Sequence, residues 1–381
     1  MTTADPIRPI FTHDIFTVQR VGGVTRYVVE LHKALRRRGV PSSIMCSLHI
    51  CDLMSGIPSS YGIRLPSKLQ VRGTTEPMQW IDRVVERAAL RLFRGDRSRT
   101  VLHRTYYSNS AAELAGASVL TVHDMIHERR PDLFVDAGVA TSRKQTSCKH
   151  ADMIIAISEH TKRGLVERFQ IDPRRIAVCH HGATTTAPND AMLEALSSSV
   201  PFMLYVGGRD GYKNFDGLLV AYRESQAFHE GIRLVAFGGG EPSALELARL
   251  EGLGIRKHVS FARGDDAALA AHYAAARAFI YPSLEEGFGL PPLEAMLHGC
   301  PVAASLGGAI PEVVGDAAAL FEPQQMDGIR SAIDLVCLGG DLRAELAVRG
   351  RARASTFTWE KAADVTLGVY ERALRLARGP V

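Results

Sequence analysis

Two acidic side chains bracket a glycine-rich turn in Ser283–Glu294, which reads SLEEGFGLPPLE. Glu286 precedes the turn and Glu294 lies one turn into the helix expected after it, so both carboxylates can face one cleft and accept hydrogen bonds from hydroxyl groups. Gly287 and Gly289 let the backbone approach a ligand closely, and the helix start offers free N–H groups to an anion. Two solvated carboxylates would need no glycines between them, so the pattern favours a binding site.

Two cations follow an earlier strand in Tyr205–Phe215, which reads YVGGRDGYKNF. Arg209 and Lys213 lie four residues apart just past this strand, where both can reach one anionic group. Arginine binds phosphate through two parallel hydrogen bonds, whereas lysine acts as a point charge. A phosphate-binding loop is therefore one interpretation, and a surface turn with two solvated cations is the alternative.

A pair of glycines, Gly22 and Gly23, precedes the helix expected at Val24–Arg38. Their backbone N–H groups can cradle a phosphate at the helix start, although a plain tight turn explains the pair equally well. The same helix carries Lys33 and Arg36–Arg38, which add positive charge to this part of the chain.

His123 and Asp124 stand side by side at the end of the strand expected at Ser118–His123. A histidine beside an acid at a strand terminus is typical of a site residue, because parallel sheets bind ligands at the carboxyl ends of their strands. His103 and His180–His181 also follow strands but have less context, so we interpret them as structural or substrate-lining.

Short apolar strands alternate with longer helices along the whole chain. The expected strands are Ser43–Leu48, Thr100–His103, Ser118–His123, Asp152–Ile157, Arg175–His180, Phe202–Gly207, Arg233–Phe237, Val259–Ala262, Ala278–Pro282 and Val302–Ala304. The expected helices are Val24–Arg38, Met78–Arg94, Val139–Lys149, Glu159–Phe169, Phe215–Ser225, Ser243–Leu250, Ala267–Ala276, Pro291–His298 and Trp359–Ala377. Because the strands are apolar throughout, they predict parallel sheets buried on both faces by helices. The fold class is therefore α/β.

The chain of 381 residues is long enough for two such domains. The turn-rich run ATTTAPND and the following SSSVP lie within Ala183–Val200 and indicate a linker. We therefore expect doubly wound domains at residues 1–190 and 191–358, followed by a last helical segment at 359–381.

Several classes of protein lack support in the sequence. No stretch reaches the roughly 18 apolar residues of a membrane span, and residues 1–10 have no signal-peptide pattern, so we expect a soluble, cytoplasmic protein. Six scattered cysteines form no Cys-x-x-Cys, and Cys46 and Cys51 would point to opposite faces of a strand. The motifs of dinucleotide, P-loop, zinc-protease and serine-hydrolase sites are absent, as is an Asp-x-Asp pair for a metal-bound nucleotide. We expect neither a metal nor a cofactor.

Positive charge is concentrated in the first half of the chain. Residues 1–190 hold 27 Lys and Arg against 18 Asp and Glu, whereas residues 191–381 hold 18 against 23. A basic half suits nucleic acid, an anionic membrane or an anionic substrate. The sequence contains no aromatic–basic motif for nucleic acid, so we expect no such partner.

In this order and spacing, the motifs resemble those of the retaining GT-B glycosyltransferases of the GT4 family, also called glycosyl transferases group 1. The motifs that carry the resemblance are GGVTRY, HD after a strand, AISEHT, GRDGYKN, EGFGLPPLE, GCPVAA and GGAIPEVVGD, which together span nearly the whole chain. The resemblance implies a donor site in the cleft between the two domains and a C-terminal helix that crosses back onto the N-terminal domain. Glu285 directly precedes Glu286, but the spacing to Glu294 favours Glu286 as the site carboxylate.

The resemblance also implies roles for individual residues. Arg209 and Lys213 would bind the donor diphosphate in place of a metal ion, and Gly22 and Gly23 would donate backbone N–H groups to the same phosphates. Family members retain anomeric configuration by front-face attack, in which the departing phosphate takes the acceptor's proton, so no enzymic nucleophile is needed.

The remaining implied roles concern the hydroxyl groups of the donor. Glu294 would bind the ribose hydroxyls and Glu286 those of the transferred sugar, with His123 facing the sugar near its anomeric centre. The backbone of Phe288, Gly289 and Leu290 would also contact the sugar.

The GRDGYKN and GGVTRY forms resemble members that act on mannose-type donors in bacterial polysaccharide assembly. We therefore expect GDP-mannose or a GDP-deoxyhexose as donor and a saccharide or lipid-linked saccharide as acceptor. Asp82–Arg99 contains arginines at 83, 87, 91, 94, 97 and 99, which either dock on anionic lipid at the inner face of the membrane or form a solvated helix face. A UDP-sugar donor, a sugar-nucleotide epimerase or phosphorylase and a non-catalytic nucleotide-sugar binding protein remain as alternatives.

Overall fold

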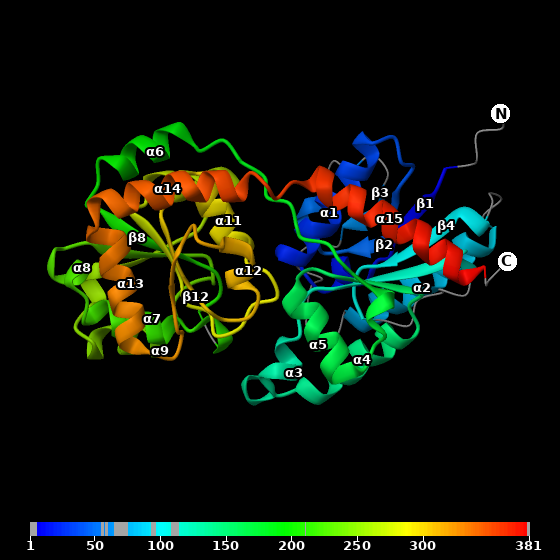
Figure 1. The fold of residues 1–381 in the computed structure, drawn as a ribbon, viewed down its shortest axis with the longest axis horizontal. Coiled ribbons are helices and arrows are strands. Elements are labelled where there is room, and N and C mark those ends of the chain that lie inside the picture. Colours follow the sequence, from blue (N-terminus) through cyan, green and yellow to red (C-terminus); the bar gives the residue numbers. More distant parts are fainter. Residues whose placement is uncertain are drawn as a thin grey trace. The chain divides into compact units, whose positions relative to one another are not determined.

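The computed structural model describes residues 6–54, 57, 60–64, 75–92, 97–107, 114–209 and 211–378. The chain folds as two compact units (Figure 1). The first unit runs to Gly182 and resumes at Trp359, and the second unit spans Ala183–Thr358. The first boundary therefore lies at Gly182 rather than after residue 190, because Ala183 already donates its N–H to the Phe357 carbonyl, at 3.0 Å, within the second unit.

The first unit contains one seven-stranded parallel sheet in the order β3-β2-β1-β4-β5-β6-β7. Its strands are β1 (Arg8–Phe11), β2 (Ser43–His49), β3 (Ser60–Arg64), β4 (Thr100–Arg104), β5 (Ala117–Val122), β6 (Met153–Ala156) and β7 (Ile176–Val178). Its helices are α1 (Gly23–Arg37), α2 (Thr75–Leu92), α3 (Ile126–Arg129), α4 (Ala137–Lys149), α5 (Glu159–Phe169) and α15 (Trp359–Ala377). Strands β1 and β3 were not among the strands expected from the sequence.

The last helix of the chain is part of the core of the first unit. Figure 1 shows α15, in red, beside α1, in blue, and the two helices are in contact. Trp359, Val369, Tyr370 and Leu374 are buried in one apolar cluster with residues of α1 and the sheet. The C-terminal segment therefore packs on the N-terminal sheet, as expected.

The second unit contains a six-stranded parallel sheet in the order β10-β9-β8-β11-β12-β13. Its strands are β8 (Phe202–Val206), β9 (Arg233–Phe237), β10 (Val259–Ala262), β11 (Ala278–Tyr281), β12 (Val302–Ser305) and β13 (Ala319–Phe321). Its helices are α6 (Asp190–Ser197), α7 (Phe215–Arg223), α8 (Gln226–His229), α9 (Ala244–Gly252), α10 (Asp266–Ala275), α11 (Leu290–Leu297), α12 (Ile310–Val314), α13 (Met326–Leu338) and α14 (Gly340–Ala354). The α/β fold class with two doubly wound sheets is confirmed.

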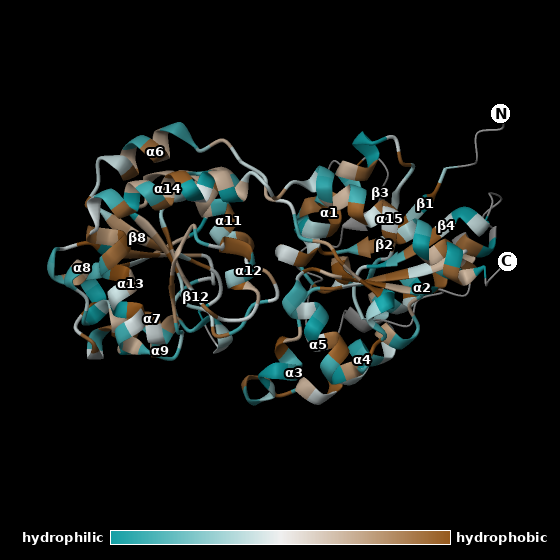
Figure 2. Cartoon of the chain, viewed as in Figure 1, coloured by the Kyte–Doolittle hydropathy of each residue, from teal (hydrophilic) through white to brown (hydrophobic). Residues whose placement is uncertain are grey.

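Burial explains why both sheets are parallel and apolar. Every residue of β4, β5, β6, β11 and β12 is buried, which requires helices on both faces. In Figure 2 the central strands are brown or tan, whereas the surrounding helices show much teal. Strand order reverses between β1 and β4 in the first sheet and between β8 and β11 in the second, and such points are where open α/β sheets bind ligands.

Two further findings concern the described residues only. None of their helices is both long enough and apolar enough to cross a bilayer. No group of three or more His, Cys, Asp or Glu side chains among them is arranged to hold a metal ion.

Candidate active site

The loop after β8 carries Lys213 and Asn214 to the carboxyl end of the sheet. Asn214 is in the left-handed conformation, with φ 55°, and its amide donates to the carbonyls of Pro282 and Pro323 at 3.1 and 2.8 Å. The N–H of Leu284 in turn donates to the Tyr212 carbonyl at 2.7 Å. Asn214 and Leu284 therefore join the β8 loop to the loops that follow β11 and β13.

Lys213 and Glu286 form a direct ion pair. The Nζ of Lys213 lies 2.7 Å from Oε1 of Glu286, and the hydroxyl of Tyr281 donates to the same oxygen at 2.7 Å. Burial disfavours the charged ammonium, but the Glu286 carboxylate outweighs it and raises the pKa of Lys213 well above its usual value. Lys213 is therefore a fixed, charged ammonium group at the end of β11.

A pair of glycines, Gly307 and Gly308, packs against the backbone of the loop that carries Glu286. The Glu286 carbonyl accepts a hydrogen bond from the N–H of Ala309 at 2.9 Å. Gly308 has φ 68°, and a Cβ atom there would lie 2.3 Å from that carbonyl oxygen. A Cβ atom on Gly307 would lie 2.5 Å from the Ser283 carbonyl. Only glycine fits at these positions, so the GG of GGAIPEVVGD determines where Glu286 lies.

Glu294 lies on α11, which begins at Leu290 rather than at the expected Pro291. The hydroxyl of Tyr273 donates to Oε2 of Glu294 at 3.2 Å. Gly289 precedes the helix with φ 118°, and Pro291 and Pro292 occupy its second and third positions. Because proline has no N–H, this helix start offers fewer free donors to an anion than we expected.

Phe288, Gly289 and Leu290 connect the two carboxylates. The Phe288 ring is buried and makes an edge contact with Phe357, with centroids 5.9 Å apart. This packing directs the Phe288 side chain into the protein, so Phe288 has only its backbone to offer a ligand. Contact of that backbone with a sugar stays a prediction.

Among the residues that the structure describes, Arg209 and Lys213 belong to separate hydrogen-bond networks. Its Nε donates to Oε1 of Glu246 at 2.5 Å, and its two NH groups donate to the carbonyls of Gly238, Gly240 and Glu241 at 2.7–3.2 Å. Glu246 was not expected from the sequence to contact Arg209; it also forms the capping box of α9 with Ser243. Of the five N–H groups of the guanidinium, one has no partner among the described residues.

The glycine pair of the first unit begins α1. Gly22 is the residue before the helix and Gly23 its first residue. The side chain of Gln19 accepts hydrogen bonds from the N–H of Thr25 at 3.1 Å and from its hydroxyl at 3.3 Å. Gln19 thus satisfies one donor at the helix start, and binding of phosphate by Gly22 and Gly23 stays a prediction.

His123 follows β5 and is 5% exposed. Among the described residues, neither of its buried ring nitrogens has a hydrogen-bond partner. Burial lowers the pKa of His123 to about 4, although the charge of Asp124 acts in the opposite direction. At neutral pH the imidazole therefore presents one N–H donor and one acceptor, which together match a hydroxyl group.

A chain of buried hydrogen bonds supports the strand that leads to His123. Thr121 lies two residues earlier on β5, and its hydroxyl contacts Nε2 of His103 at 2.7 Å and the Tyr27 hydroxyl at 3.2 Å. Nδ1 of His103 contacts the Tyr370 hydroxyl of α15 at 2.6 Å. The Tyr27 ring makes an edge contact with the His123 ring, with centroids 5.2 Å apart. His103 is therefore structural, which was one of its two interpretations.

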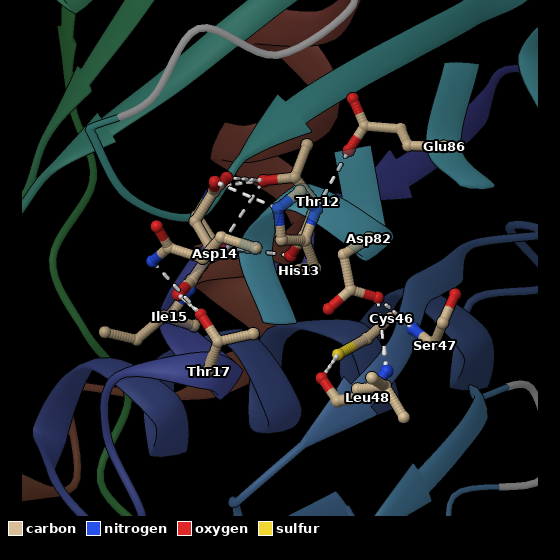
Figure 3. A network of polar contacts seen from close by, with 12 residues as sticks. Thr12, His13, Asp14, Ile15, Thr17, Cys46, Ser47, Leu48, Asp82 and Glu86 are labelled. Carbon is tan, nitrogen blue, oxygen red and sulfur yellow. Dashed lines mark hydrogen bonds and ion pairs between the residues drawn. The ribbon is translucent and has the colours of Figure 1, made fainter. Parts of the chain in front are cut away.

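A second buried polar network lies at the carboxyl end of β1 (Figure 3). Nδ1 of His13 lies 3.1 Å from Oε2 of Glu86, and Nε2 lies 3.6 Å from Oδ1 of Asp14. Oδ1 of Asp82 accepts the N–H groups of Ser47 and Leu48 at 2.5 and 3.2 Å. Asp82 and Glu86 thus attach the inner face of α2 to β2 and to the segment that follows β1, a role that the sequence did not indicate.

Two family models match this chain, one in each of its two units. Residues 194–353 match the family described as Glycosyl transferases group 1, and residues 21–187 match Glycosyltransferase Family 4. O-antigen chain mannosyltransferase B of Escherichia coli is 31% identical over 270 residues, which cover 67% of this chain and 70% of that protein. Serotype-specific mannosyltransferase WbdA of Escherichia coli is 29% identical over 247 residues, which cover 61% of this chain but 30% of that protein.

Solved structures share the fold at low sequence identity. Sucrose-phosphate synthase of Thermosynechococcus elongatus has a TM-score of 0.74 at 21% identity, with 97% of this chain and 99% of that chain covered. WaaG, a glycosyltransferase involved in lipopolysaccharide biosynthesis, has a TM-score of 0.73 at 17% identity, with 95% and 100% covered. Anabaena HepE in complex with UDP-glucose has a TM-score of 0.71 at 16% identity, with 96% and 98% covered.

Proposed function

Because the chain belongs to the glycosyl transferases group 1 of glycosyltransferase family 4 and is a glycosyltransferase, we propose that it transfers a hexose from a nucleotide-diphosphate sugar to a saccharide with retention of configuration, without a metal ion. The observation that carries this proposal is the Lys213–Glu286 pair. It places a cation and a hydroxyl acceptor together at the carboxyl ends of β8 and β11, where such sheets bind ligands.

Lys213 supplies the main positive charge for the diphosphate. As a charged ammonium group on a loop held by Asn214, it can stabilise the charge that develops on the leaving nucleotide. Arg209 contributes one further N–H group while its other hydrogen bonds hold the Gly238–Glu241 loop in place. Arg209 is therefore a single donor to the phosphates rather than the bidentate clamp that its residue type suggests.

Glu286 and Glu294 act as acceptors for hydroxyl groups, Glu286 for the transferred sugar and Glu294 for the ribose. His123, neutral at pH 7, offers its donor and acceptor to a hydroxyl of the sugar. The acceptor's hydroxyl oxygen forms a bond to the anomeric carbon on the face from which the diphosphate departs. The C–O bond to the β-phosphate breaks, and the phosphate oxygen takes the hydroxyl proton, so atoms and charge balance without an enzymic nucleophile.

We propose GDP-mannose or a GDP-deoxyhexose as the donor, in the assembly of a bacterial polysaccharide such as an O-antigen. The support is that several relatives are mannosyltransferases, one of them for an O-antigen chain. The acceptor is then a growing saccharide or a lipid-linked saccharide. A UDP-sugar is the competing donor.

The reaction itself tests the proposal. Purified protein in EDTA is incubated with GDP-mannose or a panel of UDP-sugars and with mannose-terminated oligosaccharides, and products are identified by mass spectrometry and by the anomeric coupling in NMR. An α-linked product and free GDP are expected. Transfer only from a UDP-sugar would mean that the donor is a UDP-sugar rather than a GDP-sugar. Release of a free epimer would indicate an epimerase. Binding without turnover on any acceptor would indicate a binding protein.

We also propose that the outer face of α2 contacts an anionic membrane. Its inner residues Asp82 and Glu86 are buried in the network of Figure 3, which attaches this helix to the first sheet. The exposed apolar side chains of the outer face are Trp80, Ile81, Val84 and Val85, and arginines lie beside them at positions 83, 87 and 91. Apolar side chains among arginines are typical of helices that lie in a membrane interface. Arg94, one of the arginines noted in the sequence, lies outside the described residues.

Tryptophan fluorescence tests this contact directly. Trp80 is 62% exposed and Trp359, the other tryptophan, is 4% exposed, so a blue shift with vesicles reports on Trp80. A shift with phosphatidylglycerol vesicles at low salt, weakened by salt and absent with phosphatidylcholine, is expected. Co-sedimentation should fall for Trp80→Ser and not for Leu245→Ser, which removes an exposed apolar side chain from α9 in the second unit. No shift with either vesicle would contradict the proposal.

A further inference from the structure

Each carboxylate of the Glu286 and Glu294 pair is held by a buried tyrosine that the sequence did not single out. The Tyr281 hydroxyl donates to Oε1 of Glu286 at 2.7 Å, and the Tyr273 hydroxyl donates to Oε2 of Glu294 at 3.2 Å. The two tyrosines are 2% and 1% exposed. Because both side chains are buried, their hydroxyl groups serve the two glutamates rather than a ligand.

The two oxygens of Glu286 have different surroundings. Oε1 accepts hydrogen bonds from both Lys213 and Tyr281. Among the residues that the structure describes, Oε2 has no hydrogen-bond donor. Two donors on one oxygen fix the plane of the carboxylate and leave the other oxygen to accept from a ligand hydroxyl.

Both tyrosines belong to rigid elements rather than to loops. Tyr281 ends β11, where it pairs with Ala304 of β12, and its ring stacks on Phe279 with centroids 5.8 Å apart. Tyr273 lies on α10, and its ring stacks on His298 at 5.9 Å and makes an edge contact with Phe279 at 5.6 Å. Phe279 of β11 therefore contacts both rings, which limits the movement of both tyrosine side chains.

Protonation favours the same role for Tyr281. Burial and the charge of Glu286 raise the pKa of Tyr281 well above its usual value, so the phenol keeps its proton and its O–H donates a hydrogen bond to the carboxylate. Without that donor, Glu286 would keep Lys213 as its one described partner, and the carboxylate would gain rotational freedom. Ordering the carboxylate on binding would then cost free energy and lower the affinity for the ligand.

We propose that Tyr281 and Tyr273 are positioning residues that act on different parts of one nucleotide sugar. Tyr281 acts through Glu286 on the transferred sugar, and Tyr273 acts through Glu294 on the ribose. This inference rests on the proposed function, which assigns the two carboxylates to those two groups. It predicts that loss of the Tyr281 hydroxyl weakens binding of the nucleotide sugar selectively, which a general loss of structure would not do.

Calorimetric titration in EDTA tests the pattern, with GDP and GDP-mannose as probes, or with UDP and its sugar if the wild type prefers uridine. Tyr281→Phe should raise the Kd for the nucleotide sugar about tenfold and change the Kd for the nucleoside diphosphate by no more than about twofold. Tyr273→Phe should weaken binding of both ligands by the same factor. Tyr222→Phe is the matched control, because it removes an equally buried hydroxyl, bonded to the Ile232 carbonyl at 2.6 Å, from α7 of the same unit, and it should change neither affinity.

A double-mutant cycle keeps the inference falsifiable if a variant loses stability. In the Glu286→Gln background, Tyr281→Phe should cause little further loss, because its hydrogen bond acts through that carboxylate. Equal weakening of both ligands by Tyr281→Phe, or full additivity in the cycle, would overturn the inference while leaving the proposed function intact. Failure of the wild type to bind any nucleotide or nucleotide sugar would contradict the proposed function, and this inference with it.

Discussion

The Nζ of Lys213 and Oε1 of Glu286 lie 2.7 Å apart although 73 positions separate the two residues in the sequence. The pair joins the loop after β8 to the loop after β11, the two strands between which the order of the second sheet reverses. A cation and a carboxylate that would contact different parts of a donor are thus fixed relative to each other before any ligand arrives. Preorganisation of this kind lowers the cost of binding and of catalysis.

Lys213→Ala should reduce kcat/KM at least about 30-fold, which corresponds to about 2 kcal/mol of transition-state stabilisation. The substitution removes the charge proposed for the diphosphate and leaves the part-buried Glu286 without its cation. Steady-state kinetics and thermal unfolding of the same preparation separate the two effects. Near-normal transfer by a folded Lys213→Ala protein would contradict the role of Lys213.

Gly308→Ala should displace Glu286 and lower activity at least about tenfold. A Cβ atom there would meet the backbone oxygen of Glu286 at 2.3 Å, and the positive φ of 68° adds strain. Gly252→Ala is the control, because it lies on α9 with no heavy atom within 4 Å of the added Cβ, and it should stabilise the protein slightly. Equal activity of both variants, measured together with their melting temperatures, would show that Gly308 does not support the site.

The stability of the first unit should fall as the pH is lowered from 6.5 to 5. Burial lowers the pKa of His32 to about 4, of His103 to about 3 and of His123 to about 4. In this window the unfolded chain binds more protons than the folded chain, so each histidine opposes folding by up to about 1.4 kcal/mol per pH unit. Urea unfolding at several pH values measures the slope, and a free energy of unfolding that stays constant over this window would contradict these environments.

His13 should have the opposite effect at higher pH. Burial opposes its protonation, but the hydrogen bond to Glu86 and the charges of Asp14 and Glu86 raise its pKa above 6.5. Its contribution is therefore complete below pH 6.5 and is lost as the pH rises through the raised pKa. His13→Asn should remove this loss, and NMR titration of the His13 ring should give a pKa above 6.5. A lower measured value would contradict the contacts shown in Figure 3.

Removal of α15 should unfold the first unit and spare the second. The buried residues Trp359, Val369, Tyr370 and Leu374 belong to the core of the first unit, and burial of each large apolar side chain is worth about 1.5–3 kcal/mol. A chain that ends at Thr358 should therefore lose the cooperative unfolding of the first unit, whereas the fragment Ala183–Thr358 should fold, because its core is its own. Circular dichroism and limited proteolysis of both chains test this, and a stable first unit without α15 would contradict it.

The sequence predicted the fold class and most strands of both sheets, but the strands β1, β3 and β13 and the helices α12, α13 and α14 were not among the expected elements. The long apolar runs of β5, β6, β8 and β11 are typical of buried parallel strands, and the structure confirms them. The central strand β1 was missed because it is four residues long and contains Pro9, which cannot donate a ladder hydrogen bond. Its position depends on pairing with β2 and β4, which residues 8–11 alone do not encode.

The sequence also located the charged residues of the candidate site, but not the groups that hold them. Glu286 and Lys213 belong to motifs whose glycines and spacing are visible in the chain. Tyr281 looks like any buried strand residue, and Glu246 like an ordinary helix cap. Their roles follow from tertiary contacts between distant segments, which no local pattern reports.

Binding of GDP and UDP in EDTA, measured by calorimetry for the wild type and for Lys213→Ala, tests the central claim most directly. We predict that GDP binds the wild type with a micromolar Kd without added metal, and that UDP binds much more weakly. Lys213→Ala should raise the Kd for GDP at least about tenfold. Micromolar binding of UDP alone would change the proposed donor to a UDP-sugar and would still support a metal-free diphosphate site. Binding of either nucleotide only after a divalent cation is added, or equal binding by Lys213→Ala, would contradict the account.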